Sequence, residues 1–360
     1  MKNWPVVTLA ALLVLGGCAT TKTRPAVPSP TSDTQARRPE SPIEHELFRD
    51  LKGWEQDDHS AAFEAYRATC QVLRDTASLQ VCRRAMSVDM LDGVHARAFF
   101  EDNFDVEAIL GTGILTAYFA PEYEARSKPD GEFSAPVRAK PRDLVTDARG
   151  APKAPYPDRA WIETQGSSDA LAWMRPEELF FLQIQGSGLL TFPDGRRSKA
   201  LYAANNGRPF VGIANQMRDQ GLLAGDNTSG DSIARWLASH RGPQAQAIMW
   251  LNPRYVFFRM GTDDGLPPVG AAGLPLPAGR AVALDLGRHT LGQVFWIDGT
   301  APILSGAFPQ YRRLVMGLDT GGAIKGEVRA DLYLGQGRQA GVEAGRVRHT
   351  LRLHRLIPKP

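Results

Sequence analysis

Segments with β-strand character lie in two parts of this chain, and helical patterns precede and separate them. Helical signals come first, β-rich segments run from about 114 to 205, helical patterns return over 212–251, and β-rich segments fill the rest. We find no internal repeat. This order predicts an α+β protein, mainly β, in which one β region is inserted within another element of the chain.

The N-terminus predicts export. Lys2 supplies a positive charge, and the apolar run Trp4 to Leu15, 12 residues long, suits a signal peptide but is too short to span a bilayer as a helix. The run ends in Leu15-Gly16-Gly17-Cys18, which resembles a bacterial lipobox. We therefore expect a signal peptide over 1–17, lipidation of Cys18, and, because Ala19 rather than Asp follows, the periplasmic face of the outer membrane. An ordinary signal peptide with a chance cysteine is the alternative.

Residues 18–40 predict a flexible, lipidated tether, because the stretch from Thr20 to Arg38 is rich in Thr, Pro, Ser, Lys and Arg and holds almost no large apolar side chain. The remaining chain is long enough for two domains. Lipidation of Cys18 leaves Cys70 and Cys82, 12 residues apart, which form either a disulfide in an oxidising compartment or two buried free thiols.

The net charge of +3 and a pI near 8.8 describe a mildly basic chain. Such a charge suits an anionic polymer partner and is too weak to indicate nucleic acid. The seven histidines show no metal-ligand spacing, so no metal site is predicted. Ser187 lacks the first glycine of a nucleophile elbow. The run Gly335 to Ala340 matches a dinucleotide fingerprint, but the chain ends before the acidic residue that a nucleotide site would need.

Helices are predicted from caps and from apolar residues on one face. Ser41 to Glu44 reads as a capping box that leads into Leu47 and Leu51. Ser60 is expected to cap a second helix. This second helix carries Phe63, Tyr66, Cys70 and Leu73, and the further helical segments are 95–100, 212–223, 232–240 and 244–251.

Strands are predicted where β-branched and aromatic residues cluster. Ile114 to Phe119 stops at Pro121, Phe180 to Ile184 is a second strand, and Leu189 to Phe192 meets the turn Pro193-Asp194-Gly195. Residues 118–205 are expected to form a compact β region. The later strands are expected near 255–260, 280–284, 294–297, 313–318, 330–334 and 350–356.

Two segments could bind a sugar. Thr116 and Tyr118 share one face of a strand by the period of two, and a hydroxyl beside an aromatic ring suits a sugar rim and face. Gln185, Ser187 and Asn206 offer uncharged hydrogen-bonding groups among glycines that allow a ligand close to the backbone. An ordinary half-buried strand and a polar hairpin are the structural alternatives.

Three aspartates follow apolar strands near the C-terminus. Asp319 opens a glycine-rich turn, Asp331 lies among apolar neighbours, and Asp285 ends a strand. Burial would raise the pKa of a carboxyl group, which a general acid at neutral pH requires. Each aspartate alone could simply bind turn amides, but the three together favour catalysis.

These segments, in this order, resemble the membrane-bound lytic murein transglycosylase A family over most of 90–357. The family's three-Asp region corresponds to about 270–357, with Asp285, Asp319 and Asp331 in its three positions. Ala117 and Phe119 stand where the family more often has Gly and Tyr, and the stretch from Leu286 to Gln293 lacks the usual Ile-Pro. The resemblance implies a double-psi β-barrel with helical additions, built from 41–117 and 206–360, with 118–205 inserted as a second β domain.

The activity that the resemblance implies is non-hydrolytic cleavage of the MurNAc–GlcNAc β-1,4 bond of peptidoglycan, with a 1,6-anhydromuramic end as product. Asp331 would be the catalytic acid and Asp319 its orienting partner, and no cofactor would be needed. Thr116, Tyr118, Gln185, Ser187, Asn206 and Asp285 would bind the glycan strand. A hydrolase on the same scaffold and a non-catalytic wall-binding lipoprotein are the alternatives.

Overall fold

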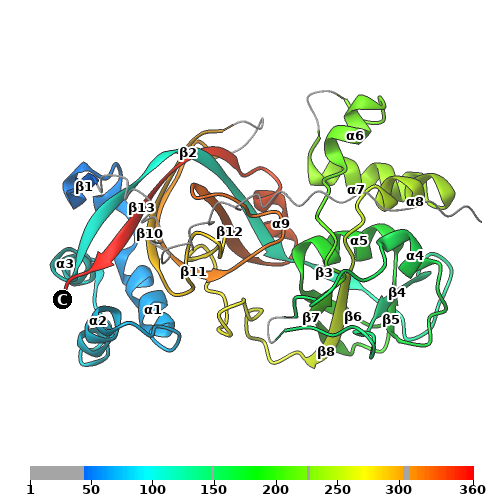
Figure 1. Cartoon of the computed structure of the whole chain (residues 1–360), viewed down its shortest axis with the longest axis horizontal. Coiled ribbons are helices and arrows are strands. Elements are labelled where there is room, and N and C mark those ends of the chain that lie inside the picture. The colour runs from blue at the N-terminus through cyan, green and yellow to red at the C-terminus, as the bar shows by residue number, and fades with distance from the viewer. Residues whose placement is uncertain (1–43, 148–149, 225–227, 303–307) are drawn as a thin grey trace, which may run out of the picture. The chain divides into compact units, whose positions relative to one another are not determined.

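The computed structural model describes residues 44–147, 150–224, 228–302 and 308–360 (Figure 1). The described residues belong to one compact unit. The predicted signal peptide, Cys18 and the tether lie outside the described residues. No helix in the described part of the chain is long and apolar enough to cross a membrane.

Three α-helices precede the long strand β2 (Phe104–Ala120), each capped by an aspartate. They are α1 (His59–Thr69), α2 (Thr76–Met86) and α3 (Gly93–Asn103). Helices α1 and α3 confirm the prediction, although the side chain of Asp58, not Ser60, accepts the Ala61 amide at the start of α1. Helix α2 was not predicted. Cys70 and Cys82 form a disulfide between α1 and α2, which settles the choice that the sequence left open.

The helix predicted after Ser41 is wrong. Residues 44–46 form strand β1 (Glu44–Glu46), which pairs with β2 (Phe104–Ala120), and Phe48–Asp50 is a single 3-10 turn. The local signal was a capping box, whose first residues lie outside the described chain. Pairing with a strand about 60 residues later supplies the backbone hydrogen bonds, so tertiary context overrides the local preference.

Six strands close into a barrel in the order β2, β12, β9, β11, β10 and β13, with β13 pairing back onto β2. The closed barrel confirms the predicted fold class. Every strand expected in this region is present. The strands besides β2 are β9 (Ala281–Ala283), β10 (Val294–Pro302), β11 (Tyr311–Asp319), β12 (Arg329–Gln336) and β13 (Arg348–Pro358).

Strand β10 shows why the barrel has two apolar faces. Phe295 and Ile297 point into one buried cluster with Leu115 and Leu332, whereas Trp296 points into the cluster that joins the barrel to α1–α3. Alternate residues therefore bury opposite sides of the same strand, which explains its continuous apolar run.

The region after β2 contains a second, four-stranded sheet in the order β3-β6-β7-β8 and a two-stranded sheet β4-β5. The turn at Pro193-Asp194-Gly195 joins β6 to β7 as predicted, with Gly195 at φ 80°. Strand β8 pairs with β7, so this sheet includes residues beyond 205. Its elements are β3 (Glu122–Glu124), β4 (Ala135–Arg138), α4 (Arg159–Glu163), β5 (Ala170–Met174), β6 (Gly188–Thr191), β7 (Arg197–Asn205) and β8 (Val256–Thr262).

The strand predicted at Phe180 to Ile184 is wrong, because these residues belong to helix α5 (Pro176–Gln185). A short apolar run has the same appearance in a buried strand and in a buried helix. The flanks identify the helix: Pro176 stands in its first turn, two glutamates follow, and Gly186 ends it at φ 85°.

The remaining helices include three that the sequence predicted, α6 (Ala214–Asp219), α7 (Gly230–Ser239) and α8 (Pro243–Trp250), which pack together with Phe180 of α5. Helix α9 (Gly337–Ala344) was not predicted. It follows β12 through Gly335 and Gly337, which have φ values of 112° and 78°. The dinucleotide-like motif is therefore the tight turn between β12 and α9.

Candidate active site

The centre of the candidate site is Ala283, on the short strand β9. Its two neighbouring strands place Asp319 and Asp331 opposite it, one on each side. Two strand spacings separate the aspartate backbones by about 10 Å. Because alanine has a small side chain, the space above β9 stays open between the two carboxylates.

Asp331 lies next to Thr116 in the register of β12 and β2. The Thr116 hydroxyl donates a hydrogen bond to Asp331 Oδ1. Burial raises the pKa of Asp331, and the opposing effects of Arg329 and of the Thr116 hydrogen bond are smaller. A carboxyl group in this environment stays protonated to higher pH than an exposed aspartate does.

Arg329 lies two residues before Asp331 on the same strand. Its Nη2 donates to Thr116 Oγ1 at 2.8 Å, and its Nη1 donates to the carbonyl of Ile114 at 3.2 Å. Burial lowers the pKa of Arg329, with the charge of Asp331 acting in the opposite direction. Thr116 therefore connects a cation to the carboxyl group without direct contact between the two.

Asp319 has a different set of partners. The Tyr118 hydroxyl donates to its Oδ2 at 2.7 Å, and the Ala271 amide donates to its Oδ1 at 3.0 Å. Burial raises the pKa of Asp319, and these hydrogen bonds counter that effect in part. Since both oxygens are engaged, Asp319 is less free than Asp331 to exchange a proton.

Asp285 supports the loop that follows Asp319. Its carboxylate accepts the amides of Gly326 at 2.9 Å and Gly287 at 3.0 Å, and Lys325 lies 3.5 Å away. The Gly326 hydrogen bond is the main cause of its lowered pKa. Asp285 therefore stays ionised and stabilises the loop through the Gly326 amide.

The two half-buried aspartates, Asp319 and Asp331, line a cavity of about 260 Å³. The barrel and the region inserted after β2 both contribute to its wall. Gln185, at the end of α5, reaches the barrel, and its Oε1 accepts the amide of Phe119 at 3.2 Å. Residues that line the cavity include Thr116, Tyr118, Gln185, Phe210, Arg254, Ala283, Asp319, Gly322, Arg329 and Asp331.

Three of the expected substrate-binding residues do not line this cavity. Asn206 is completely buried, and its side chain joins Pro157, Pro253 and Tyr255. Its predicted substrate contact is wrong because no surface remains for a ligand. Ser187 and Asp285 are also absent from the cavity wall. The structure thus brings together Asp331, Asp319, Thr116, Tyr118 and Gln185.

Three arginines that line the cavity, Arg159, Arg254 and Arg329, were missed in the sequence. Arg329 could have been found, because the period of two in a strand places it on the same face as Asp331. Arg254, in the segment between α8 and β8, carries no comparable signal. It reaches the cavity only through the packing of the inserted region against the barrel.

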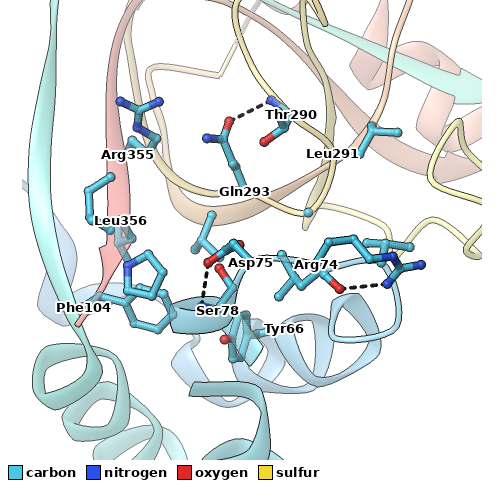
Figure 2. A pocket seen from close by; sticks show the side chains of 16 residues that line it. Tyr66, Arg74, Asp75, Ser78, Phe104, Thr290, Leu291, Gln293, Arg355 and Leu356 are labelled. Atoms are coloured by element: carbon cyan, nitrogen blue, oxygen red, sulfur yellow. Dashed lines mark hydrogen bonds between the residues drawn. The ribbon is translucent and has the colours of Figure 1, made fainter. Parts of the chain in front are cut away.

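Figure 2 shows a larger cavity, of about 510 Å³, between α1–α2 and the barrel. Its wall is mainly apolar, and two of its polar side chains bind the local backbone. Asp75 accepts the Ser78 amide at 2.8 Å, and Gln293 accepts the Thr290 amide at 2.9 Å. Neither half-buried aspartate reaches this space. In the described chain, no group of three or more His, Cys, Asp or Glu could hold a metal ion.

Comparisons with known proteins agree with this geometry. The family model of the MltA specific insert domain matches residues 114–259, and that of the 3D domain matches 280–357. The chain is 33% identical to membrane-bound lytic murein transglycosylase A of Vibrio cholerae, over 68% of this chain and 66% of that protein. The Escherichia coli K12 protein of the same name is 30% identical, over 72% and 70%.

Solved structures show the same similarity over nearly the whole chain. A membrane-bound lytic murein transglycosylase from Agrobacterium tumefaciens has a TM-score of 0.77 and 32% identity, over 88% of this chain and 97% of that one. MltA from Neisseria gonorrhoeae has a TM-score of 0.73 and 27% identity, over 88% and 92%. The chain therefore belongs to the membrane-bound lytic murein transglycosylase A family and is a peptidoglycan lytic transglycosylase.

Proposed function

We propose that Asp331 is the general acid and base that cleaves the MurNAc–GlcNAc β-1,4 bond. The observation that carries this proposal is the burial of its carboxyl group in the cavity, which raises its pKa. A protonated Asp331 donates its proton to the glycosidic oxygen as the C1–O bond breaks. Positive charge then develops on the muramyl ring.

The second half of the reaction uses the substrate's own nucleophile. The C6 hydroxyl of the same ring attacks C1, and its proton passes to the Asp331 carboxylate. Because this hydroxyl is tethered to the reacting carbon, no bound water needs a second carboxylate to activate it. The product is a 1,6-anhydromuramic end, and Asp331 regains its starting proton.

We assign supporting roles to the other lining residues. Asp319, held by Tyr118 and Ala271, stays near the reacting ring as a source of negative charge and orientation. Thr116 orients the Asp331 carboxyl group. Gln185 joins the inserted region to the end of β2 and contributes a polar contact for the glycan.

The proposed reaction is tested by the mass of the product. Purified protein incubated with sacculi is expected to release fragments lighter by one water molecule than those of a hydrolase. Fragments of the hydrolysed mass would instead favour a water-activating Asp319. Binding to sacculi without release of fragments would favour the non-catalytic wall-binding protein.

We further propose that Cys18 carries a lipid that anchors the protein at the periplasmic face of the outer membrane. The lipobox-like sequence and the name membrane-bound of the relatives support an association with the membrane. Cys18→Ser is expected to move the protein from the membrane fraction to the soluble periplasm. Unchanged membrane partition would contradict the anchor.

For the domain organisation we propose the predicted division, with 118–205 inserted into a barrel domain of 41–117 and 206–360, and with one change. The pairing of β8 with β7 supports including β8 in the insert. The expected consequence is that substitutions in β8 destabilise the inserted sheet before the barrel, as measured by hydrogen exchange.

A further inference from the structure

Arg254 enters the cavity from a rigid backbone segment between α8 and β8. The side chain of Asn252 accepts the Arg254 amide at 3.2 Å, and the guanidinium of Arg159 donates to the Arg254 carbonyl at 2.8 Å. Both supporting side chains are 2% exposed. These two hydrogen bonds hold the backbone of Arg254 in place at the wall of the cavity, which Arg159 and Asn252 also line.

The Arg254 guanidinium has few partners. Nη1 donates to the Arg208 carbonyl at 3.3 Å, and Arg254 forms no salt bridge with the described residues. Burial lowers its pKa, so the cation lies in a partly desolvated place without a compensating carboxylate. Neighbouring Arg159 is the contrast, because its guanidinium pairs with Glu163 at 2.9 Å and binds two carbonyls.

Gly322 makes room for this guanidinium. The residue belongs to the glycine-rich turn that begins after Asp319. A Cβ atom at Gly322 would lie 3.1 Å from Arg254 Cζ, closer than a relaxed contact. The turn that carries Asp319 and the side chain of Arg254 are therefore in direct contact at the cavity wall.

A planar guanidinium with free N–H groups recognises carboxylates by paired hydrogen bonds. In peptidoglycan the muramyl residues carry the carboxyl groups, on the lactyl ether when no peptide is attached or on the peptide stem when one is present. The N-acetylglucosamine residues carry none. A carboxylate site beside Asp331 would therefore distinguish the two alternating sugars.

We infer that Arg254 is a specificity-determining residue that binds a carboxylate of the muramyl residue at the cleavage site. This inference rests on the proposed function. By binding this carboxylate, Arg254 determines which of the two alternating sugars occupies the site. The glycosidic bond of a muramyl C1 then lies next to Asp331. Arg329 is less suited to bind a carboxylate, because its guanidinium already donates hydrogen bonds to Thr116 and to two backbone carbonyls.

The test compares three substrates: peptide-free strands with free lactyl carboxylates, the same strands with those carboxylates converted to methylamides, and peptide-bearing strands. Arg254→Gln is expected to lower kcat/KM on strands with the recognised carboxylate by about 10- to 100-fold, mainly through KM. The same variant is expected to match the wild type on the amidated strands. Arg254→Lys should keep part of the activity, because lysine keeps the positive charge but cannot form the paired hydrogen bonds of a guanidinium.

If Arg254→Gln loses kcat/KM on peptide-free strands, the ligand is the lactyl carboxylate. If it loses kcat/KM on peptide-bearing strands, the ligand is the carboxylate of the peptide stem. Equal losses on charged and amidated strands, or no loss on any, would overturn the inference. Failure of the wild type to form anhydro ends on all three substrates would instead refute the proposed function.

Two further variants guard against a folding artefact. Gly322→Ala displaces the guanidinium without changing any charge, and we expect a smaller loss with the same dependence on the carboxylate. Arg346→Gln, which removes an exposed arginine after α9, is the control and should behave as the wild type on all substrates. All variants should keep the wild-type melting temperature within a few degrees. If Gly322→Ala kept the full wild-type preference for strands with the carboxylate, this result would contradict the assigned contact between the Gly322 turn and Arg254.

Discussion

Aspartates line two cavities of this protein, and the pKa values of Asp331 in one and Asp75 in the other shift in opposite directions. In the cavity of about 260 Å³, burial raises the pKa of Asp331. In the cavity of about 510 Å³, burial also acts to raise the pKa of Asp75, but hydrogen bonds from Ser78 outweigh it and the pKa is lowered. The volume of a cavity therefore does not show whether an aspartate in its wall can act as a general acid.

The difference follows from the elements that carry the two residues. Asp75 caps α2, where free amides at the helix start stabilise a carboxylate, and it is exposed. Asp331 lies within β12, whose backbone amides serve the sheet, so its carboxyl group relies on Thr116. A mid-strand aspartate under a cavity can hold a proton that a capping aspartate releases.

The largest expected effect is on activity. Asp331→Asn keeps the volume of the side chain but cannot donate an acidic proton, so we expect turnover of sacculi to fall by about 10²–10⁴-fold. Asp75→Asn is the matched control, because asparagine also caps helices, and its activity should be near normal. Asp319→Asn should lie between the two.

These three variants are measured together, each after a check for a native melting transition. A folded Asp331→Asn protein with near-normal turnover would refute the assignment. If Asp319→Asn alone were inactive, the acid would have to be Asp319.

The next effect concerns stability at the larger cavity. Replacing Cys70 and Cys82 by serine removes a cross-link over 12 residues, which should lower the free energy of unfolding by about 3 kcal/mol. Urea unfolding of the double variant and of the reduced wild type measures this. Activity per folded molecule should not change, and its loss in a still-folded variant would show that the two cavities are coupled.

A smaller effect is expected at Asp285. Asparagine there can keep one of the two amide hydrogen bonds but loses the charge, at a cost of about 1 kcal/mol. Because the pKa of Asp285 is lowered by folding, its contribution is present above the unfolded pKa of about 3.9 and is lost as the pH falls through the folded value. The stability difference from the wild type should therefore disappear in acid, and a constant difference would contradict this role.

The smallest effect has the opposite pH dependence. Folding raises the pKa of Asp331, so the protonated carboxyl group does not destabilise the folded protein in acid. The free energy of unfolding then falls as the pH rises through the folded pKa. Asp331→Asn should therefore raise the melting temperature by roughly a few degrees at pH 7.5 and by less at pH 4.5. A gain that is larger in acid would show that Asp331 is not destabilised by burial. Wild-type turnover should also fall as the pH rises through this pKa.

Local sequence was sufficient for the barrel strands β9 to β13 and for the two aspartates of the site, whereas of β2 it predicted only the second half. Apolar and β-branched runs predicted β9 to β13, and the turn after Asp319 was visible from its glycines. It was not sufficient for α5 or β1. A five-residue apolar run does not distinguish a buried helix from a buried strand, and a capping box cannot compete with pairing to a distant strand.

The strands β9 to β13 and the candidate acids could be predicted from the amino-acid sequence, because strand period, turn residues and burial preference are local properties. Only the tertiary structure separated the three aspartates into two enclosed carboxyl groups and one ionised loop support. The Thr116 hydroxyl lies 215 residues before Asp331, and Tyr118 lies 201 residues before Asp319. Desolvation and hydrogen bonding set the proton affinity of a carboxyl group, and both come from residues that the fold, not the chain order, brings together.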